Sequence, residues 1–289
     1  MGRAARPGWT PAENNARGQA PSDRHRHTGA VGRIPEDSCR RTRAGGSGRR
    51  RGRPPEQPTY HEHVTTLLLV RHGLIAATGR TLSGWTPGLH LDERGTRQAR
   101  ALRDRLARVP LAALVASPLE RCVETASILG EGRGLEVQPD ERIGEVRYGD
   151  WTGRDLKALA KEPLWRMIQV HPSAAEFPHG EPLRAVQSRA VDAVRDWNAR
   201  LGADATWVLC SHGDVIKALL ADALGMHLDL FQRLQVDPCS LSVVRYTQLR
   251  PSVVRINDNG GGIDDLLPQK KRRRRSPDAV VGGGAGGAG

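Results

Sequence analysis

Two histidines in this chain directly follow short apolar runs. His72 comes two residues after the run at 65–70, and His212 comes two residues after the run at 206–210. Arg121 comes five residues after a third apolar run, at 111–116. In parallel sheets the carboxyl ends of the strands meet at one edge, where ligands bind. The sequence therefore predicts that these three side chains converge at one edge of a sheet.

These residue types can hold and transfer a phosphoryl group. Arg71, directly before His72, and Arg121 can form a forked cage for phosphate oxygens. A neutral His72 imidazole can attack phosphorus and carry the group as phosphohistidine, while His212 stabilises the oxygens of the transition state. Glu145, in a polar loop-like stretch, can protonate the leaving oxygen and then accept a proton from water. This chemistry needs no metal and no cofactor.

Each of these residues also has an ordinary structural explanation when taken alone. His212 can be a hydrogen-bonded turn histidine, and Glu145 can be a solvated loop acid. Arg121 can be a helix-surface charge paired with Glu124. Position favours a joint site, because three of the residues follow three predicted strands at the same end.

The elements that must position these residues alternate along the chain. Apolar runs predict buried strands, and apolar residues three or four apart predict helices. An alternating pattern at 241–246 and 253–256 predicts an edge hairpin. The expected strands are 65–70, 111–116, 135–138, 206–210, 241–246 and 253–256. The expected helices are 92–109, 117–129, 183–201 and 214–224, with Ser117 as N-cap of the second helix and Gly130 closing it. This order predicts an α/β fold with a mainly parallel central sheet and helices on both faces.

Charge separates a neutral middle from two basic tails. Of the formal net charge of +12, residues 1–63 carry +7 and residues 270–289 carry +5. Because 1–63 is rich in Arg, Gly, Pro and Ser, and 259–289 in Gly and basic residues, we expect two disordered tails around a domain at 64–258. A second interpretation is that translation starts at Val64 and 1–63 is never made.

Composition also limits partners and location. No apolar run is long enough to span a membrane, and no secretory signal is present. The four cysteines are far apart and form no zinc-ligand pair, so we expect reduced thiols and a cytoplasmic protein. The basic run at 270–275 is either a solvated tail or an electrostatic hook for nucleic acid or acidic partners, and we expect no nucleic-acid binding beyond weak attraction through the tails. Nothing in the sequence indicates an oligomeric state.

Four motifs resemble those of the histidine phosphatase superfamily, in its phosphoglycerate-mutase-like branch. They lie in order along the chain at 67–73 (LLLVRHG), 117–126 (SPLERCVETA), 145–153 (EVRYGDWTG) and 211–214 (SHGD). The resemblance covers about residues 64–257. It implies a three-layer sandwich, with a sheet between two layers of helices.

The resemblance also implies a role for each matched residue. His72 is the phosphorylated nucleophile, and Glu145 is the proton donor and acceptor. Arg71, Arg121 and His212 hold the phosphoryl oxygens. Further contacts to phosphate or substrate are implied for Thr78, Ser83 and Gly84.

Some positions depart from the family pattern. Leu74 and Thr78 stand where the family usually has Glu and Asn, which predicts a weaker grip on phosphate. Val146 stands where phosphoglycerate mutases usually have Arg, which favours hydrolysis over mutase activity. We therefore expect a metal-independent phosphatase acting through phosphohistidine on a small phosphorylated metabolite. The alternatives are a phosphomutase that uses the same residues and a non-catalytic phosphate-binding module.

Overall fold

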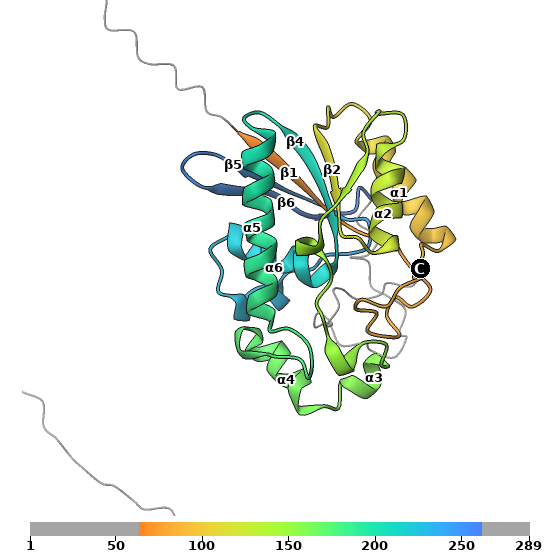
Figure 1. Cartoon of the computed structure of the whole chain (residues 1–289), viewed down its shortest axis with the longest axis vertical. Coiled ribbons are helices and arrows are strands. Elements are labelled where there is room, and N and C mark those ends of the chain that lie inside the picture. The colour runs from red at the N-terminus through yellow and green to blue at the C-terminus, as the bar shows by residue number, and fades with distance from the viewer. Residues whose placement is uncertain (1–63, 262–289) are drawn as a thin grey trace, which may run out of the picture. The chain divides into compact units, whose positions relative to one another are not determined.

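The computed structural model describes residues 64–261, which form a six-stranded sheet covered by helices. The strands are β1 (Thr65–Arg71), β2 (Ala113–Ala116), β3 (Val137–Pro139), β4 (Thr206–Ser211), β5 (Leu241–Tyr246) and β6 (Pro251–Asp258). Their order in the sheet is β3-β2-β4-β1-β5-β6 (Figure 1). The first four strands of this order run parallel to one another. β5 pairs antiparallel with β1, and β6 pairs antiparallel with β5. The prediction of a mainly parallel sheet is confirmed.

The helices lie on both faces of the sheet. They are α1 (Glu93–Arg105), α2 (Glu120–Gly130), α3 (Leu156–Leu159), α4 (Pro163–Val170), α5 (Leu183–Leu201) and α6 (Gly213–Ala223). The described residues also form short 3-10 turns at Glu141–Ile143, Gly149–Trp151, Pro172–Ala174 and Leu228–Arg233. The helices α1 and α2 pack together on one face, and α5 and α6 pack together on the other (Figure 1). The expected three-layer sandwich is therefore present.

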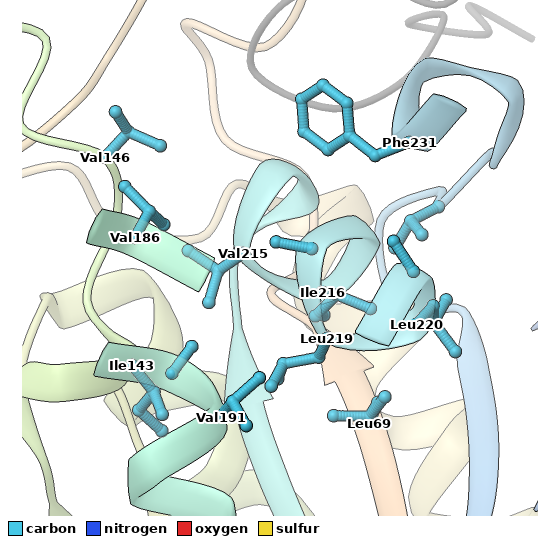
Figure 2. Packing of buried hydrophobic residues seen from close by; sticks show 14 of the residues in the cluster. Leu69, Ile143, Val146, Val186, Val191, Val215, Ile216, Leu219, Leu220 and Phe231 are labelled. Atoms are coloured by element: carbon cyan, nitrogen blue, oxygen red, sulfur yellow. The ribbon is translucent and has the colours of Figure 1, made fainter. Parts of the chain in front are cut away.

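Alternating side chains on β1 fix that strand from both faces. Leu67 and Leu69 belong to the cluster beneath α5 and α6, and Figure 2 shows Leu69 close to Leu219 of α6. Leu68 and Val70 belong to the cluster beneath α1 and α2. Each such side chain contributes about 1.5–3 kcal/mol when fully buried. The carboxyl end of β1 is thereby held firmly where His72 begins.

Strand register brings the predicted site residues to one edge. Arg71 at the end of β1 is paired with Ser211 at the end of β4. Ala116 at the end of β2 is paired with Cys210, also of β4. The segments that follow the three strands therefore leave the sheet side by side, as the sequence predicted.

The predicted bounds agree with the structure for some elements and differ by a few residues for others. The bounds of β5 and α5 match the prediction, whereas β6 is longer and α1 ends earlier, at Arg105. The prediction of Ser117 as N-cap of α2 is wrong, because the N-cap residue is Leu119, whose side chain makes no cap. The Ser117 hydroxyl instead lies 2.8 Å from Nε2 of His212. The helix does end at Gly130, where a Cβ would lie 2.6 Å from Cδ1 of Leu114.

Several predictions concern residues outside the described range. The tail at 1–63 and the basic run at 270–275 lie outside the described residues. The hypothesis that translation starts at Val64 concerns residues 1–63 and lies outside them as well. The domain limits of 64–258 and the two tails remain predictions. Among residues 64–261, no helix has the length and apolar character needed to cross a membrane.

Candidate active site

His72 lies at the end of β1 with its imidazole almost fully buried. Its backbone N–H donates to the Ser211 carbonyl at 3.0 Å, which extends the pairing of β1 and β4 by one residue. Its Nδ1 lies 2.8 Å from the Gly73 carbonyl, and because a carbonyl only accepts, Nδ1 carries the proton. Burial, together with the positive charges of Arg121 and Arg71, keeps the pKa of His72 well below its usual value. The ring is therefore neutral near pH 7, with the lone pair on Nε2.

Arg121 reaches from α2 into the same space and is 1% exposed. Its Nη2 donates to the Gly84 carbonyl at 2.8 Å and lies 3.3 Å from Nδ1 of His212. Its Nε and Nη1 are buried, and no acceptor among the described residues binds them. A buried donor left without an acceptor costs about 1–3 kcal/mol, so these two donor nitrogens form a ready site for anionic oxygens.

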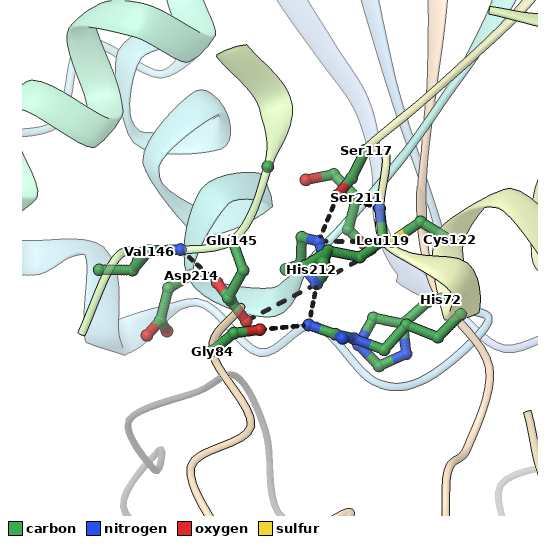
Figure 3. A network of polar contacts seen from close by, with 12 residues as sticks. His72, Gly84, Ser117, Leu119, Cys122, Glu145, Val146, Ser211, His212 and Asp214 are labelled. Atoms are coloured by element: carbon green, nitrogen blue, oxygen red, sulfur yellow. Dashed lines mark hydrogen bonds and ion pairs between the residues drawn. The ribbon is translucent and has the colours of Figure 1, made fainter. Parts of the chain in front are cut away.

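His212 lies at the start of α6 and is fully buried. Arg121 can only donate, so Nδ1 of the neutral ring accepts, and Nε2 donates to the Ser117 hydroxyl at 2.8 Å. Burial lowers the pKa of His212 well below its usual value, and the charge of Arg121 lowers it further. The rings of His72 and His212 meet edge to face with centroids 5.2 Å apart. Figure 3 shows the two side chains next to each other.

Glu145 places its carboxyl group beside this pair of imidazoles. One oxygen, Oε2, lies 3.7 Å from Nδ1 of His212, and the other, Oε1, accepts the N–H of Val146 at 3.0 Å (Figure 3). Burial raises the pKa of Glu145 to about 7, and the negative charge of Asp214 acts in the same direction. The two arginines oppose this shift but do not cancel it. Such a carboxyl group can give up or accept a proton near neutral pH.

Arg71, the last residue of β1, supplies a second buried guanidinium. Its Nη1 donates to the Val236 carbonyl at 2.8 Å. Burial lowers the pKa of Arg71, whereas the charges of Glu145, Asp214 and Asp237 raise it. An arginine remains charged under these conditions. The structure therefore gathers all five predicted catalytic side chains, namely Arg71, His72, Arg121, Glu145 and His212.

The three predicted substrate-binding residues differ in how they relate to the site. Gly84 has a φ of +50°, which glycine adopts readily, and its carbonyl is the one bound by Arg121. Ser83 precedes it and is half-buried. The Thr78 hydroxyl accepts the N–H of Ile75 at 3.1 Å, so it closes a local turn. Direct contact of these three residues with a substrate remains a prediction.

Other partners of the site were not predicted from sequence. The indole N–H of Trp85 donates to the Glu145 carbonyl at 2.6 Å. The Tyr148 hydroxyl donates to Oδ2 of the buried Asp214 at 2.9 Å. The only signal in the sequence was that these residues lie close to predicted site residues. Trp85 follows Gly84, and Tyr148 and Asp214 lie within the matched motifs. In residues 64–261, no three His, Cys, Asp or Glu side chains are grouped as ligands for a metal ion.

Comparison with known proteins agrees with this geometry. The sequence model of the histidine phosphatase superfamily (branch 1) matches residues 67–259. Phosphoserine phosphatase 1 of Hydrogenobacter thermophilus is 31% identical over 210 residues, which is 67% of this chain and 92% of the relative. The probable phosphoglycerate mutase GpmB of Yersinia pestis is 31% identical over 183 residues, covering 62% and 84%.

A solved structure is similar to this chain in fold and in sequence. Bacillus stearothermophilus YhfR superimposes with a TM-score of 0.63 at 30% identity, covering 67% of this chain and 97% of its own. The family match spans well over half of this chain and includes every residue of the candidate site. The chain belongs to the histidine phosphatase superfamily.

Proposed function

We propose that this protein is a phosphatase that hydrolyses a small phosphomonoester through a phosphohistidine on His72. Membership of the superfamily makes it an enzyme of phosphoryl transfer, a phosphatase or a phosphomutase. The observation that carries the proposal is the neutral His72 ring beside Arg121, whose Nε and Nη1 have no acceptor within the described chain. A bound phosphoryl group supplies oxygens for these donors and brings phosphorus to the imidazole.

The first step forms a bond between Nε2 of His72 and phosphorus and breaks the bond to the ester oxygen. The leaving oxygen takes its proton from Glu145, whose pKa of about 7 leaves a large fraction protonated near neutral pH. Arg71 and Arg121 neutralise the charge on the phosphoryl oxygens. The negative charge of a bound phosphoryl group also opposes the lowering of the His212 pKa and favours a hydrogen bond from that ring.

The second step returns the enzyme to its starting state. Glu145 is now ionised and takes a proton from water as the water oxygen attacks phosphorus. The bond between phosphorus and Nε2 of His72 breaks, and inorganic phosphate leaves. The carboxyl group is then protonated again, so protons balance over the cycle.

Hydrolysis is favoured over mutase activity by the residue after the acid. Val146 is fully buried in the apolar cluster beneath α5 and α6 and presents no charge to the site (Figure 2). A mutase must keep a bisphosphorylated intermediate bound, which requires more cationic contacts than a phosphatase needs. A mutase would return the phosphoryl group to substrate and would be stimulated by a bisphosphorylated primer.

The cytoplasmic location expected from the sequence stays a proposal. Its support is that the described cysteines, Cys122, Cys210 and Cys239, are buried and form no disulfide. Thiols of this kind persist in a reducing compartment. Detection of the native protein in a cell fractionation experiment tests this assignment.

Phosphate release by the full-length chain tests the function. We expect release of inorganic phosphate from p-nitrophenyl phosphate in the presence of EDTA, and loss of this activity in His72→Ala. A panel of natural phosphomonoesters then identifies the substrate. Transfer of the phosphoryl group between substrate molecules with little free phosphate would favour the mutase instead.

A further inference from the structure

Arg189 on α5 binds the backbone of the segment that carries Glu145. Its Nη1 donates to the carbonyls of Arg142 and Gly144, at 2.6 and 2.9 Å. Its Nη2 donates to the carbonyl of Glu145 itself at 3.0 Å. One guanidinium therefore connects the helix to three carbonyls within four residues of the loop.

Glu181 holds this guanidinium in place and binds the same loop. Its two carboxylate oxygens accept from Nε and Nη2 of Arg189 at 3.1 and 2.7 Å, a bidentate pair. The oxygen Oε1 also accepts the backbone N–H of Arg147 at 2.8 Å, and the N–H of Glu181 donates to the Arg147 carbonyl at 2.9 Å. The loop is thus bound on both sides of Glu145.

The position of this backbone determines where the Glu145 carboxyl group lies. The Glu145 carbonyl accepts two hydrogen bonds, from Arg189 and from the indole of Trp85. Its side chain turns back onto the N–H of Val146, so the carboxyl group follows the local peptide orientation. A shift of the carbonyl therefore moves the carboxyl group relative to His212.

The helix gives Arg189 a rigid base. Its neighbours Val186 and Ala190 are buried in the core, and α5 extends over 19 residues. The side chains of Arg189 and Glu181 are 21% and 16% exposed, so water competes little for their hydrogen bonds. Pre-organised contacts of this kind matter because a misplacement of about 1 Å can lower a rate about 10²-fold.

We propose that Arg189, held by Glu181, is the positioning residue for the general acid of the reaction. The inference rests on the proposed function and adds a determinant of leaving-group range. The proton from Glu145 is required when the departing oxygen belongs to an alkyl alcohol. It is nearly dispensable when the departing group is a stable phenolate.

The test compares two substrates in the full-length chain. Phosphoserine has a poor leaving group, and 2,4-dinitrophenyl phosphate has a good one. We measure kcat/KM, because it reports the steps up to release of the first alcohol. We expect Arg189→Lys to lower kcat/KM about 10²-fold for phosphoserine and less than about 3-fold for dinitrophenyl phosphate. A Glu145→Gln variant, which lacks the general acid, serves as the reference and should show the same selective loss.

Matched variants separate positioning from folding. Arg195→Lys lies on the same helix with a side chain 69% exposed, and we expect it to leave both substrates unchanged. Glu181→Gln weakens the anchor of Arg189 and should show the same selective loss in a smaller degree. If Arg189→Lys does not fold, as judged by circular dichroism, Glu181→Gln and Trp85→Phe decide the matter by the same ratio.

The outcomes are distinguishable. An equal loss on both substrates in folded variants, or no loss on either, overturns the positioning role and leaves the phosphatase proposal intact. If the wild-type chain does not accept phosphoserine, the best alkyl phosphomonoester of the panel takes its place in the comparison. A wild-type chain that hydrolyses no phosphomonoester overturns the proposed function, and the inference with it. A selective loss on phosphoserine supports both.

Discussion

Nδ1 of His212 and Oε2 of Glu145 lie 3.7 Å apart, with only 0% and 6% of the two side chains exposed. Burial lowers the pKa of the imidazole and raises the pKa of the carboxyl group, so the pair is not an ion pair at slightly acidic pH. Both groups are then neutral beside two charged arginines. The positive charge of the site is thereby kept for the phosphoryl group, and the acid keeps its proton for the leaving oxygen.

A phosphorylated protein should be detectable during turnover. In the wild-type chain, rapid acid-free denaturation with substrate present should trap one phosphoryl group per chain on His72, since phosphohistidine survives alkali. In His72→Ala we expect no phosphoryl group and a fall in turnover of about 10³-fold or more. Mass spectrometry of the intact chain and of its peptides makes the measurement. Phosphorylation at another residue would contradict the assigned nucleophile.

Replacement of Arg121 should raise the stability of the fold and abolish phosphate binding. Arg121→Met removes the two buried donor nitrogens that lack acceptors within the described residues, so the free energy of unfolding should rise by about 1–3 kcal/mol. Inorganic phosphate should raise the Tm of the wild-type chain but not that of the variant. Urea denaturation and thermal melts measure the two effects.

A control for this prediction exists in the turn that follows the C-terminal end of α2. Arg133 donates to the carbonyls of Leu129, Val109 and Leu106, so all its bonds are made within the fold. Arg133→Met should therefore lower the free energy of unfolding. If Arg121→Met is destabilised like Arg133→Met, Arg121 is a structural residue and not a phosphate ligand.

Ionisation of Glu145 should be visible in the pH dependence of stability. Its folded pKa of about 7 exceeds its usual value of 4.5, so from about pH 4.5 to 7 the folded chain retains a proton that the unfolded chain releases. The free energy of unfolding should fall over this window by about 3 kcal/mol relative to Glu145→Gln. Urea titrations of both chains at several pH values measure this difference. Parallel pH profiles would show that the carboxyl group is not buried as described.

Asp214 should set the pH at which activity is lost. Its negative charge raises the pKa of Glu145, so in Asp214→Asn this pKa falls and the alkaline limb of kcat/KM moves to lower pH. The exposed Asp222→Asn, on the same helix, should leave the limb in place. Because all chains are measured with the same substrate, ionisation of the substrate affects their pH profiles equally and does not contribute to the difference between them. A limb that moves to higher pH would refute the electrostatic argument.

Gly144 should tolerate no side chain. A Cβ at this position would overlap the ring of Trp85, whose indole holds the Glu145 carbonyl. Gly144→Ala should therefore cost about 1–3 kcal/mol of stability and reduce activity on phosphoserine. Gly261→Ala, where a Cβ meets nothing within 4 Å, serves as the control. Unchanged melting and activity in Gly144→Ala would show that Trp85 can move without consequence.

Sequence predicted the parts of this molecule that depend on local pattern. The bounds of the strand at 241–246 and of the amphipathic helix at 183–201 were correct to the residue, because the period of their apolar residues specifies them. The convergence of His72 and His212 followed from the parallel sheet. Glu145 was a different case, since its loop has no periodicity and the resemblance to known motifs was needed to single it out.

Other features depend on contacts that no local pattern encodes. Ser117 has the sequence of a helix cap, yet its hydroxyl binds His212, the N-cap residue of α6, which lies 95 residues later in the chain. Arg189 and Trp85 bind backbone carbonyls, and an acceptor carbonyl leaves no mark on residue identity. Their role became visible only when the loop and the helix were placed together.

The position of β1 in the sheet has a consequence for synthesis of the protein. The first strand of the fold lies between β4 and β5, which end at Ser211 and Tyr246. During translation this apolar strand is synthesised before both of the strands it pairs with, so it stays unpaired while most of the domain is made. His72 gains its contacts with Ser211 and His212 only after β4 and the start of α6 have been made, so a ribosome-bound chain that stops short of β4 should be inactive and a target for chaperones.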